Sequence, residues 1–320
     1  MDNRLTKKRL SNFLAYEWLL TLGVIIAAIM AMELLYTMLA TRLTEGQRFK
    51  YYFDEEIAAI DAFSVYNLLG VDIGKNGKTF SYDVLSVETE SLVANTDVLS
   101  MRLSLHEGDA IFTSAVEKEG AGSRAKVVVD AYSVYDYESL LASAKEYLAQ
   151  FIVSGGDIYD TADYDENLIR AYFDERMKGD NRYRTEEDKE VGRQSEIGRI
   201  LKLAKDVEDF EKILNCGKES LFFRYTKYAQ SIVLYTEDDI YTKRYDEQVK
   251  AGKADLIYGI NVAELTGGKN VSDYLKLQGN DGADGVVLEL FDFSSVQYDL
   301  QFECISFVDT LVREFSDILD

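Results

Sequence analysis

Residues 279–293 read GNDGADGVVLELFDF. The first seven residues, GNDGADG, are almost all glycine, aspartate and asparagine, which are the residue types that favour tight turns. They lead into VVLELFDF (286–293), a short apolar run of the kind that forms a buried strand. We therefore predict a turn followed by a strand, and this strand is the clearest one in the C-terminal half of the chain.

The segments on either side extend this pattern. Residues 299–319 have helical apolar spacing and predict a closing amphipathic helix, whose apolar side is formed by Phe302, Ile305, Val308, Leu311 and Phe315. Upstream, KADLIYGI (253–260) predicts a strand. The aromatic-rich stretch 221–241, LFFRYTKYAQSIVLYTEDDIY, fits a helix or a strand equally well.

The middle of the chain is highly charged. Residues 165–217 predict two helices that are separated near Gly179. The second of these carries an apolar stripe made of Ile197, Ile200, Leu201 and Leu203, so most of its charge forms a solvent-facing side. Residues 139–153 predict a further helix, which ends at Gly155 and Gly156.

Strands and helices also alternate in the first half. We predict a helix at 96–107 that ends at Gly108, and strands at 64–73, 82–88, 109–114 and 125–131. The turn GKNGK (74–78) closes the first strand, and an apolar side predicts a helical juxtamembrane segment at 42–63. This alternation predicts a mixed α/β domain over 64–320, which could divide into lobes 64–153 and 220–320 around a charged helical segment, 154–219.

A hydrophobic segment precedes this domain. WLLTLGVIIAAIMAM (18–32) has no charge and continues after Glu33 as LLYTMLA (34–40). As a helix, its 21 central residues span roughly 31 Å, close to the bilayer core of about 30 Å. A cleaved signal peptide, with a shorter apolar region and an A-x-A site, and a buried core helix are the alternatives. We predict a single transmembrane anchor helix over 13–41.

The flanks of the segment predict its orientation. Arg4, Lys7, Lys8 and Arg9 precede it, so the positive-inside rule places residues 1–12 in the cytoplasm as a tail and the C-terminal domain outside the cell. Trp18 and Tyr36 stand near the two ends, where aromatic rings settle at the membrane interface. Glu33 lies near the outer end, where it is either tolerated or contacts a partner helix. The expected location is the cell membrane, with the lipid bilayer as a partner.

Composition narrows the classes of function. Acidic residues number 57 against 35 basic ones, which gives a net charge of -22. Such a chain repels phosphate backbones, so we expect no nucleic-acid partner. The two cysteines, Cys216 and Cys304, are too few for a disulfide framework. They could form one disulfide, or they could be two unpaired buried residues.

Motifs for catalysis are missing from the sequence. The single histidine, His106, falls in the predicted helix 96–107 and fits a surface position. There is no G-x-S-x-G nucleophile elbow, no phosphate-binding P-loop and no dinucleotide fingerprint. The acidic residues Asp157, Asp160 and Asp163 could gather around calcium in an irregular loop, although capping of the following helix explains them better. We expect no enzyme activity, no catalytic residue, no metal site and no cofactor.

Two sets of segments resemble a known type of protein. VLSMRLSLHEGDAIFTSAVEKEG (98–120) resembles the helix, glycine and strand of the first lobe of extracellular solute-binding proteins of sugar transporters. The other set resembles uncharacterised membrane-tethered proteins of clostridia-type Gram-positive bacteria, which carry a reduced version of that fold: ENLIRAYFDERMKGDNRYRTEEDKEVGRQSEIGRI (166–200), YGINVAEL (258–265) and QFECISFVDTLVREFSDIL (301–319).

The resemblance implies a two-lobed, periplasmic-binding-like α/β domain that binds a small solute in a cleft near the ends of its strands. Thr113 and Ser114, which follow the strand segment DAIF, are then the implied ligand-binding residues. The chain departs from that type in its transmembrane anchor and in having Trp18 as its only tryptophan. Sugar stacking would therefore depend on its 22 tyrosines and 16 phenylalanines.

These observations favour a membrane-anchored extracellular binding module without enzyme activity. The alternative is a structural or interaction protein of the cell envelope that docks another membrane or surface protein. A weaker option is a surface hydrolase. A cleft lined by tyrosines would favour the binding module, and a large flat apolar patch would favour the interaction protein.

Overall fold

The computed structural model describes residues 18–39, 48–59, 86–92, 96–105, 107–119, 122–234, 239–292 and 302–320, together with Lys7 and Ser11. Internal contacts divide the chain into two units, Met1–Arg42 and Leu43–Asp320. The strand predicted at 64–73, the turn at 74–78, His106 and almost all of the predicted tail 1–12 lie outside the described residues.

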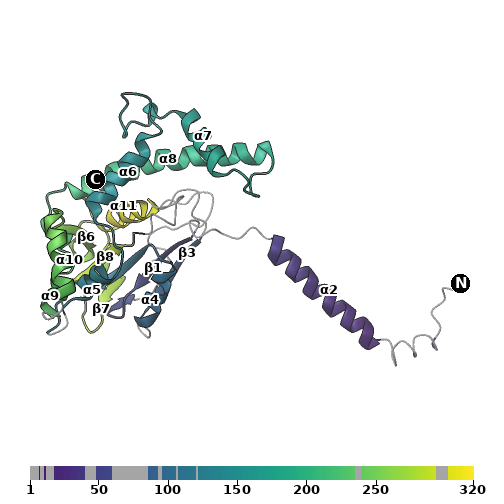
Figure 1. Ribbon diagram of the computed structural model, residues 1–320, viewed down its shortest axis with the longest axis horizontal. Helices are drawn as coiled ribbons and strands as arrows, with labels where there is room; N and C mark the ends of the chain where they lie inside the picture. The colour runs from purple at the N-terminus through teal and green to yellow at the C-terminus, as the bar shows by residue number, and fades with distance from the viewer. Residues whose placement is uncertain are drawn as a thin grey trace. The chain divides into compact units, whose positions relative to one another are not determined.

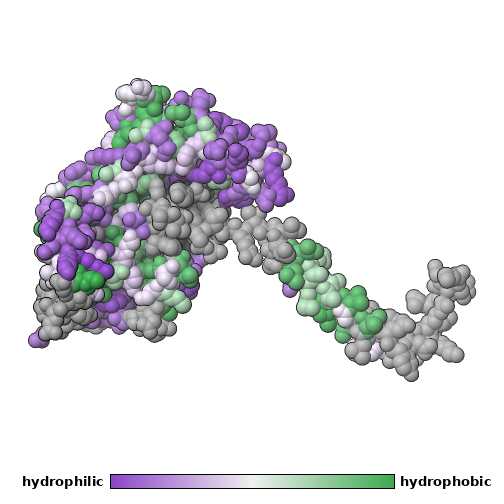
Figure 2. Space-filling model, in the orientation of Figure 1, coloured by the Kyte–Doolittle hydropathy of each residue, from purple (hydrophilic) through white to green (hydrophobic). Residues whose placement is uncertain are grey.

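The first unit contains helix α2 (Trp18–Leu39). Its described side chains are those of Trp18, Leu20 and residues 22–35, and all of them, including Glu33, are exposed. Hydrophobic residues cover most of its visible side (Figure 2). The side chain of Tyr36 lies outside the described set. Among the described residues, no helix has both the length and the apolar character needed to cross a membrane.

The second unit is built on a six-stranded mixed sheet (Figure 1). Its order is β3 (Ser86–Ser91), β1 (Arg48–Phe53), β4 (Ala110–Ser114), β8 (Val286–Leu290), β6 (Leu256–Asn261) and β5 (Phe222–Tyr225). The strands β3, β1 and β4 are parallel, and the pairs from β4 to β5 are antiparallel. A separate two-stranded sheet pairs β2 (Ile57–Ala59) with β7 (Leu275–Leu277).

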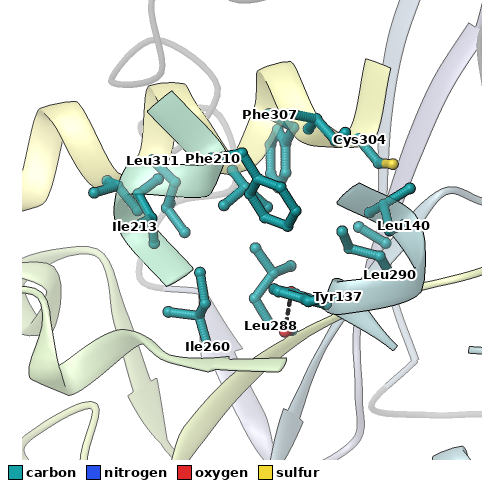
Figure 3. Close-up of a cluster of buried hydrophobic side chains, with 14 of the residues drawn as sticks. Tyr137, Leu140, Phe210, Ile213, Ile260, Leu288, Leu290, Cys304, Phe307 and Leu311 are labelled. Carbon is teal, nitrogen blue, oxygen red and sulfur yellow. Dashed lines mark hydrogen bonds between the residues drawn. The ribbon is translucent and has the colours of Figure 1, made fainter. Parts of the chain in front are cut away.

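Helices cover both faces of the six-stranded sheet. One face packs against α6 (Tyr137–Ala149), α8 (Glu186–Leu214) and α11 (Glu303–Phe315). Figure 3 shows Phe210, Phe307 and Leu288 in the cluster between these helices and the strands, where the Tyr137 hydroxyl donates a hydrogen bond to the Leu288 carbonyl (3.0 Å). The other face packs against α4 (Thr96–Ser104), α5 (Arg124–Ala131) and α9 (Ala229–Leu234). The result is a three-layer α/β/α domain.

The remaining elements lie around this sandwich. Helix α7 (Glu166–Arg176) packs along α8 (Figure 1), and α10 (Asp239–Lys250) follows α9. The buried Glu196 of α8 holds two arginines, accepting from Arg199 at 2.8 and 3.0 Å and from Arg176 at 3.1 Å. Short 3-10 helices are η3 (Thr161–Asp163), η4 (Glu219–Leu221), η5 (Val262–Glu264) and η6 (Val271–Asp273).

The structure confirms the mixed α/β class and many of the predicted elements. The helices expected at 96–107, 139–153, 165–217 and 299–319 are α4, α6, the pair α7 and α8, and α11. The strands expected at 109–114, 253–260 and 286–293 are β4, β6 and β8. In the predicted turn, Gly279 and Gly285 have φ of 83° and 80°. The undecided stretch 221–241 contributes β5, α9 and the start of α10.

Two predicted elements are wrong. The helical segment at 42–63 contains β1 and β2 instead, because Tyr51 and Phe53 pack on one face of the sheet while Tyr52 packs on the other. The strand at 125–131 is helix α5, which Ser123 caps by accepting from the Lys126 N–H. The triple valine suggested a strand, but Ala125, Val128 and Val129 follow helical spacing and bury one side.

The sheet also joins the two regions considered as separate lobes. Strand β4, from 64–153, pairs directly with β8, from 220–320. All of Leu43–Asp320 forms one compact unit.

Candidate functional site

A cavity of about 570 Å³ opens at the edge of the sheet where β8 ends. It is bordered by the start of α6, the loop after β5, the end of α10 and the start of β6. We call it the Tyr228 cavity. Its polar and aromatic lining includes Tyr135, Asp136, Ser139, Ser143, Lys227, Tyr228, Gln248, Lys253, Tyr258 and Asp292, and its apolar lining is Val134 and Phe302.

Tyr228 stands in this cavity in a rare backbone conformation. Its φ is 72°, in the left-handed region that residues with a Cβ seldom adopt. Asp130, in the last turn of α5, holds the loop in place. Its carboxylate accepts from the Tyr228 N–H, from the Tyr225 hydroxyl (3.0 Å) and from the Ser231 hydroxyl (2.7 Å) and N–H (3.3 Å). Four hydrogen bonds to one charged group therefore hold the backbone of the loop at Tyr228 in place.

Two lysines line the same cavity. The half-buried Lys227 donates one hydrogen bond from Nζ to the Tyr132 carbonyl (2.9 Å), and Nζ lies 5.7 Å from the centre of the Tyr228 ring. Burial lowers the pKa of Lys227; Asp130 opposes this effect and the positive charge of Lys253 adds to it. In the part of the chain that the structure describes, neither lysine has a carboxylate within ion-pairing distance.

Tyr258, Asp136 and Tyr135 supply further polar groups to the lining of the cavity. Tyr258 on β6 is buried, and its pKa is raised to about 12 by burial and then by the charges of Asp136 and Asp130. The Asp136 carboxylate caps α6 by accepting from the Ser139 N–H (2.8 Å). Tyr135 is held by its N–H, which donates to the Leu290 carbonyl (2.9 Å). The cavity thus combines fixed aromatic surfaces with two lysines, a lining suited to holding a small polar molecule.

A second cavity, of about 500 Å³, lies between the end of α7 and the start of α8. Its charged side chains are largely used within the protein: Arg193 pairs with Asp174 at 2.8 Å, and Lys189 pairs with Glu186 at 2.7 Å. Arg193 and Lys189 of this cavity thus already have acidic partners, unlike the two lysines of the Tyr228 cavity.

The predicted ligand-binding residues lie elsewhere. Thr113 and Ser114 are buried on β4. The Thr113 hydroxyl donates to Glu289 Oε2 (2.6 Å), and the Ser114 hydroxyl accepts from the Val116 N–H (3.2 Å). They line neither of the two cavities, and their role in binding stays a prediction.

The other residues considered from the sequence can also be placed. Asp160 caps η3, and Asp163 accepts from the Asp157 N–H (2.7 Å). Among the described residues, no three His, Cys, Asp or Glu side chains gather as a metal site would require. Cys216 and Cys304 are free thiols.

Sequence reasoning missed Lys227, Tyr228 and Lys253. Lys227 and Tyr228 fall in the stretch that fitted helix or strand equally well, and Lys253 begins the predicted strand KADLIYGI. The aromatic residues around Lys227 in the sequence could have indicated a binding site. However, only the pairing of β5 with β6 brings the two lysines to one cavity.

Comparison with known proteins adds no relative: no protein-family model, no curated protein and no solved structure matches this chain.

Proposed function

We propose that the domain Leu43–Asp320 is a non-enzymatic binding module that captures a small molecule in the Tyr228 cavity. The observation that carries the proposal is the fixed placement of Tyr228 beside Lys227 in a cavity of about 570 Å³. Cavities of roughly 300–1,000 Å³ with aromatic walls and a few placed polar groups are typical of ligand sites.

The backbone at Tyr228 supports this proposal. A residue held in the left-handed region costs on the order of 1–3 kcal/mol, and such strain is concentrated at functional positions. Here the Asp130 hydrogen bonds offset the cost. The structure thus maintains a costly loop that presents an aromatic ring and an ammonium group to one cavity.

A thermal-shift screen of the purified full chain tests this function. The panel comprises sugars, amino acids, short peptides and organic acids. A ligand at a hundred times its Kd should stabilise the fold by about 2.7 kcal/mol. The shift should disappear in Tyr228→Gly, which keeps the backbone conformation and removes the ring, and should persist in Tyr183→Ala, which removes a ring from the other cavity. Lack of any shift across the panel would overturn the proposal and favour the docking of an envelope protein.

We propose further that α2 anchors this domain in a membrane, with the domain outside the cell. The support comes from the sequence, in which the largely apolar residues 19–39, taken as a helix, would span roughly 31 Å, close to a bilayer core of about 30 Å. Its described side chains are exposed, and from Leu22 to Met32 they are apolar or glycine. Such a surface is unfavourable in water. Trp18 and Tyr36 would meet the two interfaces, and Glu33 would lie near the outer one.

Extraction and labelling test the anchor. The full chain should stay in the membrane fraction after alkaline carbonate treatment, whereas Ile25→Arg with Ile29→Arg should release it. Cys216 is a half-exposed free thiol of the domain. A membrane-impermeant maleimide should label it on intact cells, with Cys216→Ser as the control. Labelling only after permeabilisation would contradict the extracellular location.

A further inference from the structure

We propose that the ligand of the Tyr228 cavity carries a single oxyanion, a carboxylate or a phosphate ester, which binds between Lys227 and Lys253. This inference rests on the proposed binding function and specifies the chemistry of the ligand.

The hydrogen bonding of the Lys227 ammonium group is incomplete among the described residues. An ammonium group has three N–H donors. Lys227 uses one of them, on the Tyr132 carbonyl, and the described residues supply no acceptor for the other two. Two other partly buried lysines of the domain have acidic partners: Lys50 pairs with Glu90 at 2.9 Å, and Lys145 pairs with Glu211 at 2.5 Å. An oxyanion would complete the bonding of Lys227 in the same way.

The cavity also contains two positive charges, those of Lys227 and Lys253. Lys253 is exposed at the rim, and its charge acts on the half-buried Lys227. Two cations in one cavity repel each other. Asp130 and Asp292 offset part of this repulsion at Lys227, and a bound anion would offset more of it. The unpaired lysines are notable because the chain has 57 acidic residues and 35 basic ones.

The aspartates of the cavity limit the charge of the ligand. The Asp136 carboxylate accepts from the Ser139 N–H at 2.8 Å, keeps its negative charge, and forms no ion pair with a lysine among the described residues. Asp292 also lines the cavity and contributes negative charge near Lys227. A ligand with several negative charges would be repelled by these two groups. The lining therefore favours one oxyanion over two or more.

The aromatic lining defines the rest of the ligand. Tyr228 and Tyr258 present rings in the same cavity as the lysines, and Phe302 adds an apolar surface. Rings stack on planar or apolar groups. We therefore expect the oxyanion to be attached to a ring or another apolar portion.

Matched pairs of compounds test the inference by calorimetry on the full chain. Each pair differs only in charge, for example benzoate with benzamide, and 4-hydroxyphenylacetate with its amide. Phthalate supplies a dianion, and inorganic phosphate supplies the oxyanion alone. We expect at least one acid to bind, and to bind about tenfold or more tightly than its amide, because hydrogen bonds to charged groups are the stronger ones. We expect the dianion to bind more weakly than the monoanion.

Lysine variants locate the contact. Lys253→Gln removes one charge at the exposed rim and should weaken binding of the acid several-fold without changing binding of the amide. Lys250→Gln is the matched control, because Lys250 is an exposed residue at the end of α10 that does not line the cavity. Lys227→Gln should weaken binding more strongly than Lys253→Gln.

The outcomes separate the two proposals. If a neutral compound binds as tightly as its acid, or if neither lysine variant changes binding of the acid, the oxyanion inference is overturned while the binding function stands. If only neutral sugars or amides from the broader screen bind, the result is the same. If no compound binds, the proposed function itself fails.

Discussion

The central sheet has two edges at which its strands begin and end, and these two edges differ in how their charged side chains are paired. Where β1 and β4 end, Arg124 donates two hydrogen bonds of 2.9 Å to the fully buried Asp54, and Lys118 pairs with Glu56 at 2.5 Å. Where β8 ends, Lys227 and Lys253 line a cavity and have no ion pair among the described residues. The paired edge lies at the carboxyl ends of the parallel strands β1 and β4, and the cavity lies at the opposite edge, because β8 runs antiparallel to β4.

The paired edge is the one that the direction of the parallel strands points to. Ligands of open α/β sheets usually bind at the carboxyl ends of parallel strands. In this protein the Asp54 hydrogen bonds raise the pKa of Arg124 and occupy its guanidinium group. A ligand at this edge would have to break that pair. The opposite edge offers two lysines that form no ion pair among the described residues.

Breaking the paired edge should have the largest effect on stability. Arg124→Met leaves the buried carboxylate of Asp54 without its partner, which should lower the free energy of unfolding by about 3 kcal/mol or more. Urea denaturation measures this change. The double variant Asp54→Asn with Arg124→Met should recover part of the loss, because it removes the stranded charge. A single variant as stable as the wild type would show that the pair contributes little.

Glu289 lies on β8 between the two edges and should make stability depend on pH. It is fully buried, and burial raises its pKa well above the ordinary value of 4.5. The folded state therefore retains this proton more strongly than the unfolded state. Its contribution to stability is present below the unfolded pKa and is lost as pH rises above it toward the folded pKa.

Glu289→Gln should remove this loss, because glutamine does not titrate. We expect the variant to be more stable than the wild type at pH 7, because glutamine stays neutral when buried without taking up a proton. The advantage should shrink as pH falls toward 4. Urea denaturation at several pH values tests this, and equal pH slopes for the two proteins would refute it.

The two edges also differ in backbone strain, which should have a smaller effect on stability than the charges. At the paired edge, the left-handed positions Gly122 (φ 68°) and Gly285 (φ 80°) are glycines. At the cavity edge, Tyr228 takes such a conformation with a full side chain. Tyr228→Gly and Tyr228→Ala both remove the ring, but alanine keeps a Cβ. We expect the glycine variant to be about 1 kcal/mol more stable in thermal unfolding. Equal stabilities would show that the loop is unstrained.

Substituting the exposed lysines Lys118 and Lys253 should change stability least. The prediction concerns the sign of each change in stability. Lys118→Gln removes the partner of Glu56 and should slightly destabilise the fold. Lys253→Gln removes a charge near Lys227 and should slightly stabilise the ligand-free protein. Urea midpoints of the two variants in parallel test the opposite signs. The same sign for both would contradict the assignment of one edge as paired and the other as unpaired.

Much of the fold could be predicted because it depends on local patterns. The stripe of Ile197, Ile200 and Leu203 repeats at helical spacing and lies buried in α8. The glycines of 279–285 form the predicted turn into β8. The prediction from local patterns was wrong where the residue types present fit both a helix and a strand. The valines of 127–129 suited a strand but form α5, and the aromatic residues of 49–53 suited a helix but form a central strand with both faces buried.

The sequence by itself determined the acidic character of the chain, the apolar segment now seen as α2, the mixed α/β class and the two charged helices α7 and α8. These follow from composition and from contacts within a few residues. Only the tertiary structure decided which charges are neutralised. Arg124 meets Asp54 across 70 positions of the chain, and Lys227 shares a cavity with Lys253 because β5 pairs with β6. Such juxtapositions depend on strand pairing and side-chain burial, which local sequence patterns do not specify.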